Sequence, residues 1–173
     1  MKVTLIKSIL IATLAMTSFA CEDDLVYSDL VQDRIPAVPV TFSNATTYGG
    51  NPFVDVSQSG ATPTITFTLS IPATSGRTIK EITKVAGGGT GINAGTLNTA
   101  SAVINTAPIP GTGTTATFTM TLADFRKKYP APGVVSTPTA AGLAPREIAF
   151  IFLVTLDDNT QIITQQVRAR ILA

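Results

Sequence analysis

The chain has 173 residues, of which 45% are hydrophobic, 13% charged and 6% aromatic, and its 28 threonines make it too apolar and too β-branched for disorder. It has no histidine and one cysteine, which excludes most catalytic constellations and zinc sites. The net charge of +1 gives no reason to expect nucleic acid as a partner.

The first 20 residues have the order of a secretory signal peptide. Lys2 and Lys7 precede an apolar stretch over residues 8–16, and small residues then lead to Ala20. This stretch is too short to span a hydrocarbon core of ~30 Å, so a permanent transmembrane anchor is not expected. Removing residues 1–20 leaves 153 residues, the size of one ordinary domain.

The single cysteine, Cys21, follows this segment at the place where bacterial lipoprotein signals carry the cysteine that becomes lipidated. Residues 18–21 (Ser-Phe-Ala-Cys) resemble a loose lipobox, from which Phe19 departs because a small residue is usual there. The resemblance implies that lipid chains on Cys21 hold the protein on a membrane without a spanning helix. The alternative is ordinary signal cleavage that leaves a free thiol.

Acidic residues gather directly after Cys21, where five of the eleven lie between residues 22 and 33. The first three, Glu22, Asp23 and Asp24, resemble the export signal of Bacteroidetes-type surface lipoproteins, which directs them to the outer face of the outer membrane. The alternative is a solvated acidic tether that keeps the domain away from an anionic surface. On both interpretations, residues 21–36 form a tether and residues 37–173 the folded domain.

Three strands are predicted in the first part of the domain. The clearest spans residues 62–71, where apolar residues at odd positions alternate with threonine or serine at even positions. Residues 37–43 alternate more weakly. Residues 78–85 have an apolar residue at every third position, which fits neither face of a regular strand and indicates a bulge.

Residues 114–122 alternate again and lead into a predicted short helix. Thr121 and Asp124 have the spacing of a capping box, and apolar residues follow at helical spacing until Pro130. The basic residues 126–128 then lie at the carboxyl end, where the helix dipole favours positive charge. We prefer this interpretation to an anion-binding patch.

The last part of the chain predicts a β-hairpin. Residues 146–156 are apolar on both faces, which is typical of a central strand. Residues 157–160 (Asp-Asp-Asn-Thr) have turn chemistry. The returning strand over residues 161–172 is expected to turn Ile163, Val167, Ala169 and Ile171 inward, with Thr164, Gln166, Arg168 and Arg170 outward.

These elements predict an all-β fold, an immunoglobulin-like antiparallel β-sandwich with one short helix. A partly open barrel is the alternative. The chain lacks the paired cysteines and the tryptophan of true immunoglobulin domains. Residues 150–163 and 167–171 resemble the last hairpin of small Bacteroidetes-type lipoproteins with immunoglobulin-like domains, which implies the wider sandwich architecture.

The candidate catalytic and metal motifs lack the context that their chemistry requires. Residues 89–94 match the letters of a dinucleotide-binding fingerprint, but no amphipathic helix follows and the next acid is Asp124. Asp157 and Asp158 lack the further ligands of a calcium loop, and adjacent residues do not face one cleft as an acid and base pair must. We therefore expect no catalytic residue, no metal and no cofactor.

The best candidate for a binding loop spans residues 44–52, which contain Tyr48 and Asn51 among glycines. An exposed aromatic ring is the surface on which a pyranose ring stacks, and the chain has no tryptophan to serve that purpose. The alternative is a tyrosine that caps one end of the sandwich. Residues 131–145 form a second long loop, which either binds a partner or is an excursion without function.

Together these features predict a non-enzymatic, lipid-anchored protein of the cell envelope that acts as a surface accessory, adhesion or ligand-binding module. Many lipoproteins of the type it resembles accompany outer-membrane glycan uptake systems. The resemblance therefore implies the membrane, through lipid on Cys21, and envelope proteins or extracellular glycans as partners. The alternative is a structural pilin-like subunit that assembles by strand donation.

Overall fold

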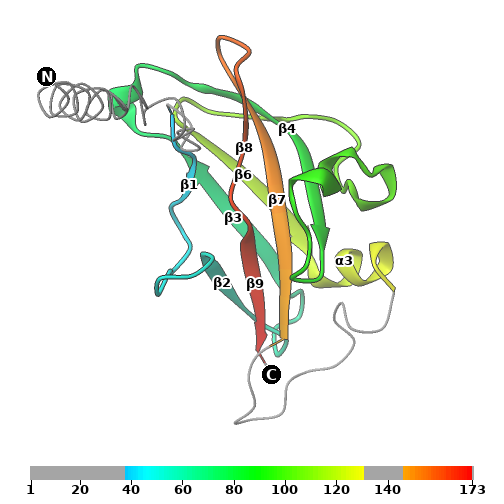
Figure 1. Ribbon diagram of the computed structural model, residues 1–173. Coiled ribbons are helices and arrows are strands. Elements are labelled where there is room, and N and C mark those ends of the chain that lie inside the picture. Colours follow the sequence, from blue (N-terminus) through cyan, green and yellow to red (C-terminus); the bar gives the residue numbers. More distant parts are fainter. Residues whose placement is uncertain (1–37, 131–145, 173) are drawn as a thin grey trace, which may run out of the picture. The chain divides into compact units, whose positions relative to one another are not determined.

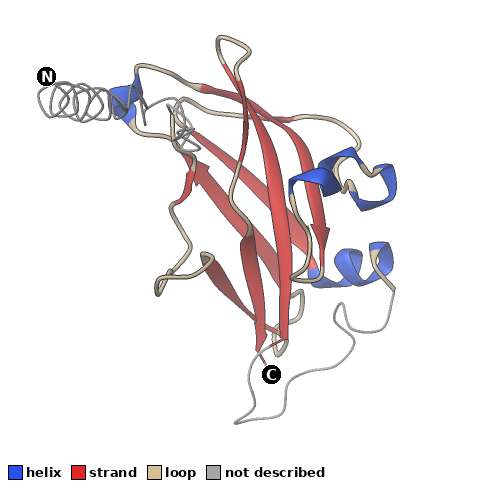
Figure 2. Cartoon of the chain, in the orientation of Figure 1, coloured by secondary structure: helices blue, strands red, loops and turns tan. Residues whose placement is uncertain are grey.

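The computed structural model describes residues 38–130 and 146–172, and most of their regular structure is β-strand (Figures 1 and 2). In chain order the elements are β1 (Thr41–Phe42), β2 (Phe53–Ser57), β3 (Thr64–Ser70), η1 (Ala73–Ser75), β4 (Ile79–Gly88), η2 (Ala94–Asn98), η3 (Ala100–Ala102), β5 (Ile109–Pro110), β6 (Thr115–Thr121), α3 (Leu122–Lys128), β7 (Arg146–Leu156), β8 (Gln161–Ile163) and β9 (Val167–Leu172). The element α3 is an α-helix, and η1 to η3 are short 3₁₀ turns.

The strands form two sheets, a small sheet in the order β1-β3-β6 and a large sheet in the order β2-β9-β7-β4-β5, in which β8 also pairs with β7. Buried residues of both sheets pack into one hydrophobic core. The prediction of an all-β, sandwich-like fold is therefore confirmed. The described strands fall into separate sheets, so the barrel alternative is wrong.

The central strand of the small sheet is β3, which pairs antiparallel with β1 and β6. Its apolar residues, including Ile65 and Phe67, are fully buried at 0% exposure, while its threonines face outward. Phe118 of β6 is buried in the same way. The alternation predicted for residues 62–71 and 114–122 is confirmed, because each strand has one face in the core and one in water.

The strand predicted over residues 37–43 is shorter in the structure, where β1 has only two residues. Beyond β1, the side chain of Asn44 takes the place of a neighbouring strand. Its amide nitrogen donates to the Thr66 carbonyl at 2.9 Å, and its amide oxygen accepts from the Thr68 N–H at 2.9 Å. The chain can therefore leave the small sheet after β1 while the Thr66 carbonyl and the Thr68 N–H of β3 keep hydrogen-bond partners.

The middle of the large sheet is β7, as predicted for residues 146–156. It pairs with β4 on one side and with β9 and β8 on the other. Phe150 and Phe152 are buried toward the small sheet, where both rings contact Phe67. On the opposite face Ile151 packs with Leu97 of η2, so both faces of β7 are covered.

The bulge predicted over residues 78–85 is confirmed. The register of β4 against β7 shifts between Ile79 and Glu81 and again between Ile82 and Lys84. The strand continues three residues beyond the predicted end, to Gly88. Glycine does not exclude a strand where another element packs closely against the backbone.

The prediction of a purely antiparallel sandwich is wrong at one pair, because β2 runs parallel to β9. Neither β2 nor β5 is predicted from the sequence, since both are short and stand among turn residues. A hairpin turn would force two strands to run antiparallel, but β2 and β9 are far apart in the sequence. No turn sets their relative direction.

The single strand predicted over residues 161–172 is interrupted, and its first part has the opposite facing. Ile163 is 48% exposed and Thr164 is buried, whereas Val167, Ala169 and Ile171 face the core as predicted. Along a regular antiparallel pair, the residue numbers of the two partners have a constant sum. This sum is one higher for Phe150↔Val167 than for Leu153↔Ile163. One extra residue therefore lies between β8 and β9, and a shift of one residue exchanges the two faces of a strand.

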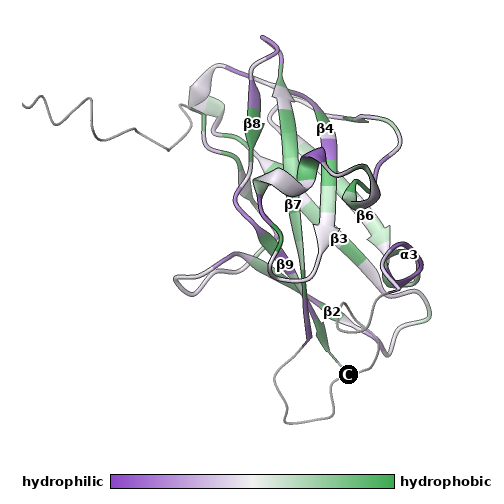
Figure 3. Cartoon of the chain, turned by 45° about the vertical axis from the view of Figure 1, so that its right-hand side comes forward, coloured by the Kyte–Doolittle hydropathy of each residue, from purple (hydrophilic) through white to green (hydrophobic). Residues whose placement is uncertain are grey.

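Strands of both sheets carry hydrophobic residues, which are coloured green in Figure 3. Between the two sheets, their phenylalanine rings pack against one another. The Phe150 ring lies 5.1 Å from that of Phe67, 5.8 Å from that of Phe118 and 5.3 Å from that of Phe125, measured between centroids. Phe125 belongs to α3, so one ring joins both sheets to the helix. Tilted and edge-to-face pairs at such separations add to the free energy of burial.

The predicted short helix is confirmed as α3. The Thr121 side chain accepts a hydrogen bond from the Asp124 N–H at 3.0 Å, which satisfies one of the free donors at the start of the helix. Leu122 and Phe125 are buried, and the three basic residues occupy the last turn. The helix ends at Lys128, two residues before Pro130.

Candidate functional site

The connection from β1 to β2 carries the predicted binding loop and has a defined conformation. Thr46 and Phe53 exchange two backbone hydrogen bonds, of 2.8 and 2.9 Å, which close the intervening residues into a loop. Inside it the Thr47 hydroxyl donates to the Gly50 carbonyl at 3.1 Å. Gly49 has a φ of 81°, which favours glycine. Hydrogen bonds within the loop therefore stabilise its reversal of chain direction.

Tyr48 lies in this loop with 85% of its surface exposed. Its ring centroid is 5.8 Å from that of Phe53, and the Arg170 guanidinium lies over the other ring at 4.3 Å from the Phe53 centroid. A cation at this distance from an aromatic face is attracted to it. Tyr48 therefore contacts Phe53 while most of its own surface remains in solvent.

Asn51, the second predicted residue of the loop, connects it to the large sheet. Its side-chain amide donates to the Gln166 Oε1 at 3.2 Å. Gln166 in turn donates from Nε2 to the carbonyls of Thr90 and Ile92 at 3.0 Å each. The Arg168 Nε donates to the same Gln166 Oε1 at 3.0 Å. Gln166 stands at the interruption between β8 and β9, so the extra residue there frees its side chain to join three segments.

Charged side chains of β2, β9 and β7 interact with one another next to these residues. The Arg168 Nη1 donates to the Glu147 Oε2 at 2.5 Å. The Arg170 Nε lies 3.8 Å from the Glu147 Oε1 and 3.9 Å from the Asp55 Oδ1. The parallel pairing sets Asp55 directly opposite Arg170. Two acids and two arginines leave the surface neutral but rich in planar hydrogen-bonding groups.

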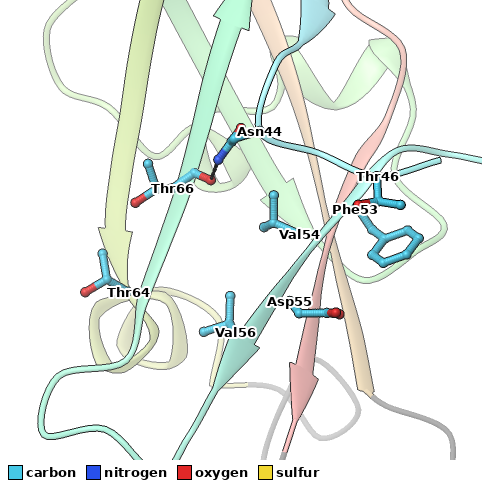
Figure 4. Close-up of a pocket in the computed structure, with 8 residues that line it drawn as sticks. All are labelled: Asn44, Thr46, Phe53, Val54, Asp55, Val56, Thr64 and Thr66. Atoms are coloured by element: carbon cyan, nitrogen blue, oxygen red, sulfur yellow. Dashed lines mark hydrogen bonds between the residues drawn. The ribbon is translucent and has the colours of Figure 1, made fainter.

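A groove of about 260 Å³ lies on the other side of β2, between this strand and β3. Figure 4 shows Val54 and Val56 pointing toward β3, while Phe53 and Asp55 point the opposite way. This is the alternation of a strand, with one face toward the groove and the other toward the aromatic and charged surface. One face of β2 therefore lines the groove, and the other contributes to the aromatic and charged surface.

We name the exposed surface formed by this loop and the outer face of β2 and β9 the Tyr48 surface. Its members are Tyr48, Asn51, Phe53, Gln166, Arg168 and Arg170. The loop composition predicts the first two. Gln166, Arg168 and Arg170 are expected to face outward, but no signal in the sequence places them beside the loop. Phe53 is missed because β2 is missed.

The motifs rejected as catalytic sites have other roles in the structure. Residues 89–93 form a loop, as expected of a glycine-rich connection, and Ala94 begins η2. The predicted turn at residues 157–160 is confirmed, with Asn159 at a φ of 66° and its N–H bonded to the Leu156 carbonyl at 3.0 Å. Arg77 forms ion pairs with Asp157 and Asp158.

No group of three or more histidine, cysteine, aspartate or glutamate side chains in residues 38–130 and 146–172 is placed to hold a metal ion. Over the same residues, no helix has the length and hydropathy needed to cross a bilayer.

Several predicted features lie outside the described residues. They are the signal peptide at residues 1–20, the tether at residues 21–36, the lipidation site Cys21, the acidic residues Glu22, Asp23 and Asp24, and the loop at residues 131–145.

Comparisons with known proteins give no match of any of the three kinds made. No protein-family model matches the chain, and neither a curated protein nor a solved structure matches it significantly. The function proposed below therefore rests on the residues of this chain.

Proposed function

We propose that the protein is a non-enzymatic, lipid-anchored protein of the cell envelope whose domain binds an extracellular glycan through the Tyr48 surface. The observation that carries this proposal is the state of Tyr48. Its ring is 85% exposed, yet the loop that presents it is closed by the Thr46 and Phe53 hydrogen bonds. A large apolar ring held in solvent is a feature of binding surfaces.

The chemistry around the ring suits a sugar. The apolar C–H face of a pyranose packs on an aromatic ring, and its hydroxyl groups need donors and acceptors at the ring's edge. Asn51, Gln166 and Arg168 supply these groups in one connected network. Because the network is already ordered before a ligand binds, little side-chain entropy is lost on binding.

The amino-terminal sequence supports the anchor. Cys21 follows a signal peptide and precedes three acidic residues, the pattern that resembles surface lipoproteins. Lipid on Cys21 would hold the domain at a membrane, with residues 22–36 as the tether. A binding domain on such a tether reaches ligands outside the cell.

The strand order supports an immunoglobulin-like form of the sandwich. Immunoglobulin-like domains place strands A, B and E in one sheet and C, F and G in the other. In chain order, β1, β3 and β6 take the places of A, B and E, and β4, β7 and β9 those of C, F and G. Loops between such strands are the usual place for a binding surface.

Protease treatment of intact cells tests the anchor and its orientation. We expect the wild-type protein to be membrane-bound and digested, Cys21→Ala to be released from the membrane, and the triple variant E22A/D23A/D24A to stay membrane-bound but protected. A wild-type protein that resists protease on intact cells but not on lysed cells would contradict surface exposure.

Binding of labelled polysaccharides to the same cells tests the Tyr48 surface. With fluorescent amylopectin, xylan and mannan as probes, we expect Tyr48→Ala to weaken binding of the preferred probe by about tenfold or more. Tyr48→Phe keeps the ring and serves as the matched control, with binding close to wild type. Equal binding by Tyr48→Ala and wild type, or no binding of any probe, would contradict glycan recognition.

The outer edge of β6 favours assembly by strand addition as a second candidate. In β6, the backbone N–H and C=O groups of the even-numbered residues form the hydrogen bonds to β3. Those of Thr117 and Thr119 therefore point away from the sheet. No strand in the described part of the chain pairs with them. An edge strand with unpaired backbone groups and neither charges nor proline can pair with a strand of another chain.

Native gels of the full chain test this second candidate. Assembly predicts a ladder of polymers that disappears when residues 22–34 are deleted and when Thr117→Pro removes one backbone donor from the edge. Thr117→Val keeps the N–H and is expected to keep the ladder. A single monomer band for the wild type at all concentrations would eliminate the candidate.

A further inference from the structure

A second hollow in the structure lies apart from the Tyr48 surface, between β4, residues 97–106 and the end of α3. Its volume is about 440 Å³, within the usual range for small-molecule sites. Its lining includes Lys84, Lys128, Asn98, Asn105, Leu97 and Ile104. We name it the lysine cavity.

One wall of the lysine cavity is fixed to β4 by Asn105. The Asn105 Oδ1 accepts from the Val85 N–H at 2.7 Å, and its Nδ2 donates to the carbonyls of Thr83 at 3.1 Å and Ala107 at 2.9 Å. The neighbouring Ile104 N–H donates to the Val85 carbonyl at 2.8 Å. These residues occupy the place of a strand beside β4, so the wall is rigid although it is irregular.

The other side is fixed to α3 by Tyr129, whose hydroxyl donates to the Ala102 carbonyl at 2.6 Å. Burial raises the pKa of Tyr129 above its usual value of 10.0, an effect that a backbone hydrogen bond from Gly87 partly offsets. The phenol therefore keeps its proton, and with it this hydrogen bond, at neutral pH. A Cβ atom on Gly87 would lie 2.9 Å from the Ile104 Cδ1, which shows how closely these elements approach.

The two lysines of this cavity come from distant parts of the chain, Lys84 from β4 and Lys128 from the end of α3. The Lys84 Nζ donates to the Leu97 carbonyl at 3.5 Å, a long bond that leaves two of its protons free. None of the residues that line the cavity is acidic. In the part of the chain that the structure describes, neither lysine has a carboxylate within ion-pair distance.

We propose that the lysine cavity binds a small organic anion that carries a carboxylate, phosphate or sulfate group on an apolar or ring-shaped body. The anionic group would lie between Lys84 and Lys128, and the body against Leu97 and Ile104. Asn98 adds a polar side chain to the same lining. Two positive charges beside apolar walls attract such an anion more strongly than either feature alone, because the walls lower the local dielectric.

Isothermal titration of the full chain with phenyl phosphate, benzoate and benzyl alcohol tests this proposal. We expect saturable binding of at least one of the two anions and much weaker binding of benzyl alcohol, which has the ring without the charge. Lys84→Gln and Lys128→Gln should each weaken anion binding by about tenfold, the usual effect of losing one charged hydrogen bond.

Lys127→Gln is the matched control, because Lys127 has the same charge and lies beside Lys128 on α3 but does not line the cavity. We expect it to bind the anions as the wild type does. If Lys84→Gln fails to fold, Lys128→Gln tests the same site from an exposed helix end. The proposal is overturned if neither anion binds saturably, or if all three variants bind equally.

Discussion

Replacing Phe150 with alanine is expected to lower the free energy of unfolding by about 3–5 kcal/mol, the range for deleting a buried phenylalanine. Phe150 is 0% exposed and contacts rings from the small sheet and from α3. Its removal leaves a cavity that these rings cannot fill, because they are attached to two strands and a helix. Urea unfolding followed by circular dichroism measures the loss.

Tyr48→Ala is the control for this prediction. It deletes an aromatic ring of similar size that is 85% exposed, so it opens no cavity. We expect its free energy of unfolding to stay within about 0.5 kcal/mol of wild type. This control also matters for the binding experiment, because lost glycan binding in Tyr48→Ala must not result from unfolding. Equal destabilisation by the two variants would show that Phe150 is not part of a packed core.

Gly111→Ala is expected to destabilise the domain by about 3 kcal/mol although it adds a single methyl group. A Cβ atom at this position would overlap the carbonyl oxygen of Ile79 and lie 2.8 Å from its carbonyl carbon. Gly111 is held there because its N–H donates to the Lys80 carbonyl at 2.9 Å. The obstructing atoms are backbone in β4, so no side-chain rotation relieves the overlap.

The matched control is Gly89→Ala, since a Cβ atom there has nothing within 4 Å. Thermal unfolding of both variants compares the same chemical change in a crowded and in an open place. We expect the unfolding free energy of Gly89→Ala to lie within about 1 kcal/mol of wild type, because alanine restricts the unfolded chain slightly. If Gly111→Ala melted at the wild-type temperature, the close approach of β5 to β4 would be wrong.

Local patterns predict the elements that have one dominant signal. Residues 62–71 and 114–122 alternate with a period of two, and both form strands whose apolar residues enter the core. Thr121 and Asp124 have the spacing of a helix start, and a helix begins at Leu122. In each case the decisive interactions lie within a few residues of one another, so the sequence contains them directly.

The same local reasoning fails where long-range packing decides. A continuous alternation over residues 161–172 is the simplest prediction, but one extra residue before β9 exchanges the two faces. Thr164 enters the core because its hydroxyl accepts the Phe152 N–H at 3.1 Å, a partner on a different strand. Such a hydrogen bond compensates for burying a polar group, and its partner is visible only after folding.

The Tyr48 surface divides in the same way. The sequence by itself determined that Tyr48 and Asn51 stand in a glycine-containing loop, because turn residues are a local property. Only the tertiary structure placed Phe53, Gln166 and Arg170 beside them, through the parallel pairing of β2 with β9. That pairing joins strands that are far apart in the sequence, and its stability comes from packing and sheet hydrogen bonds that no short segment contains.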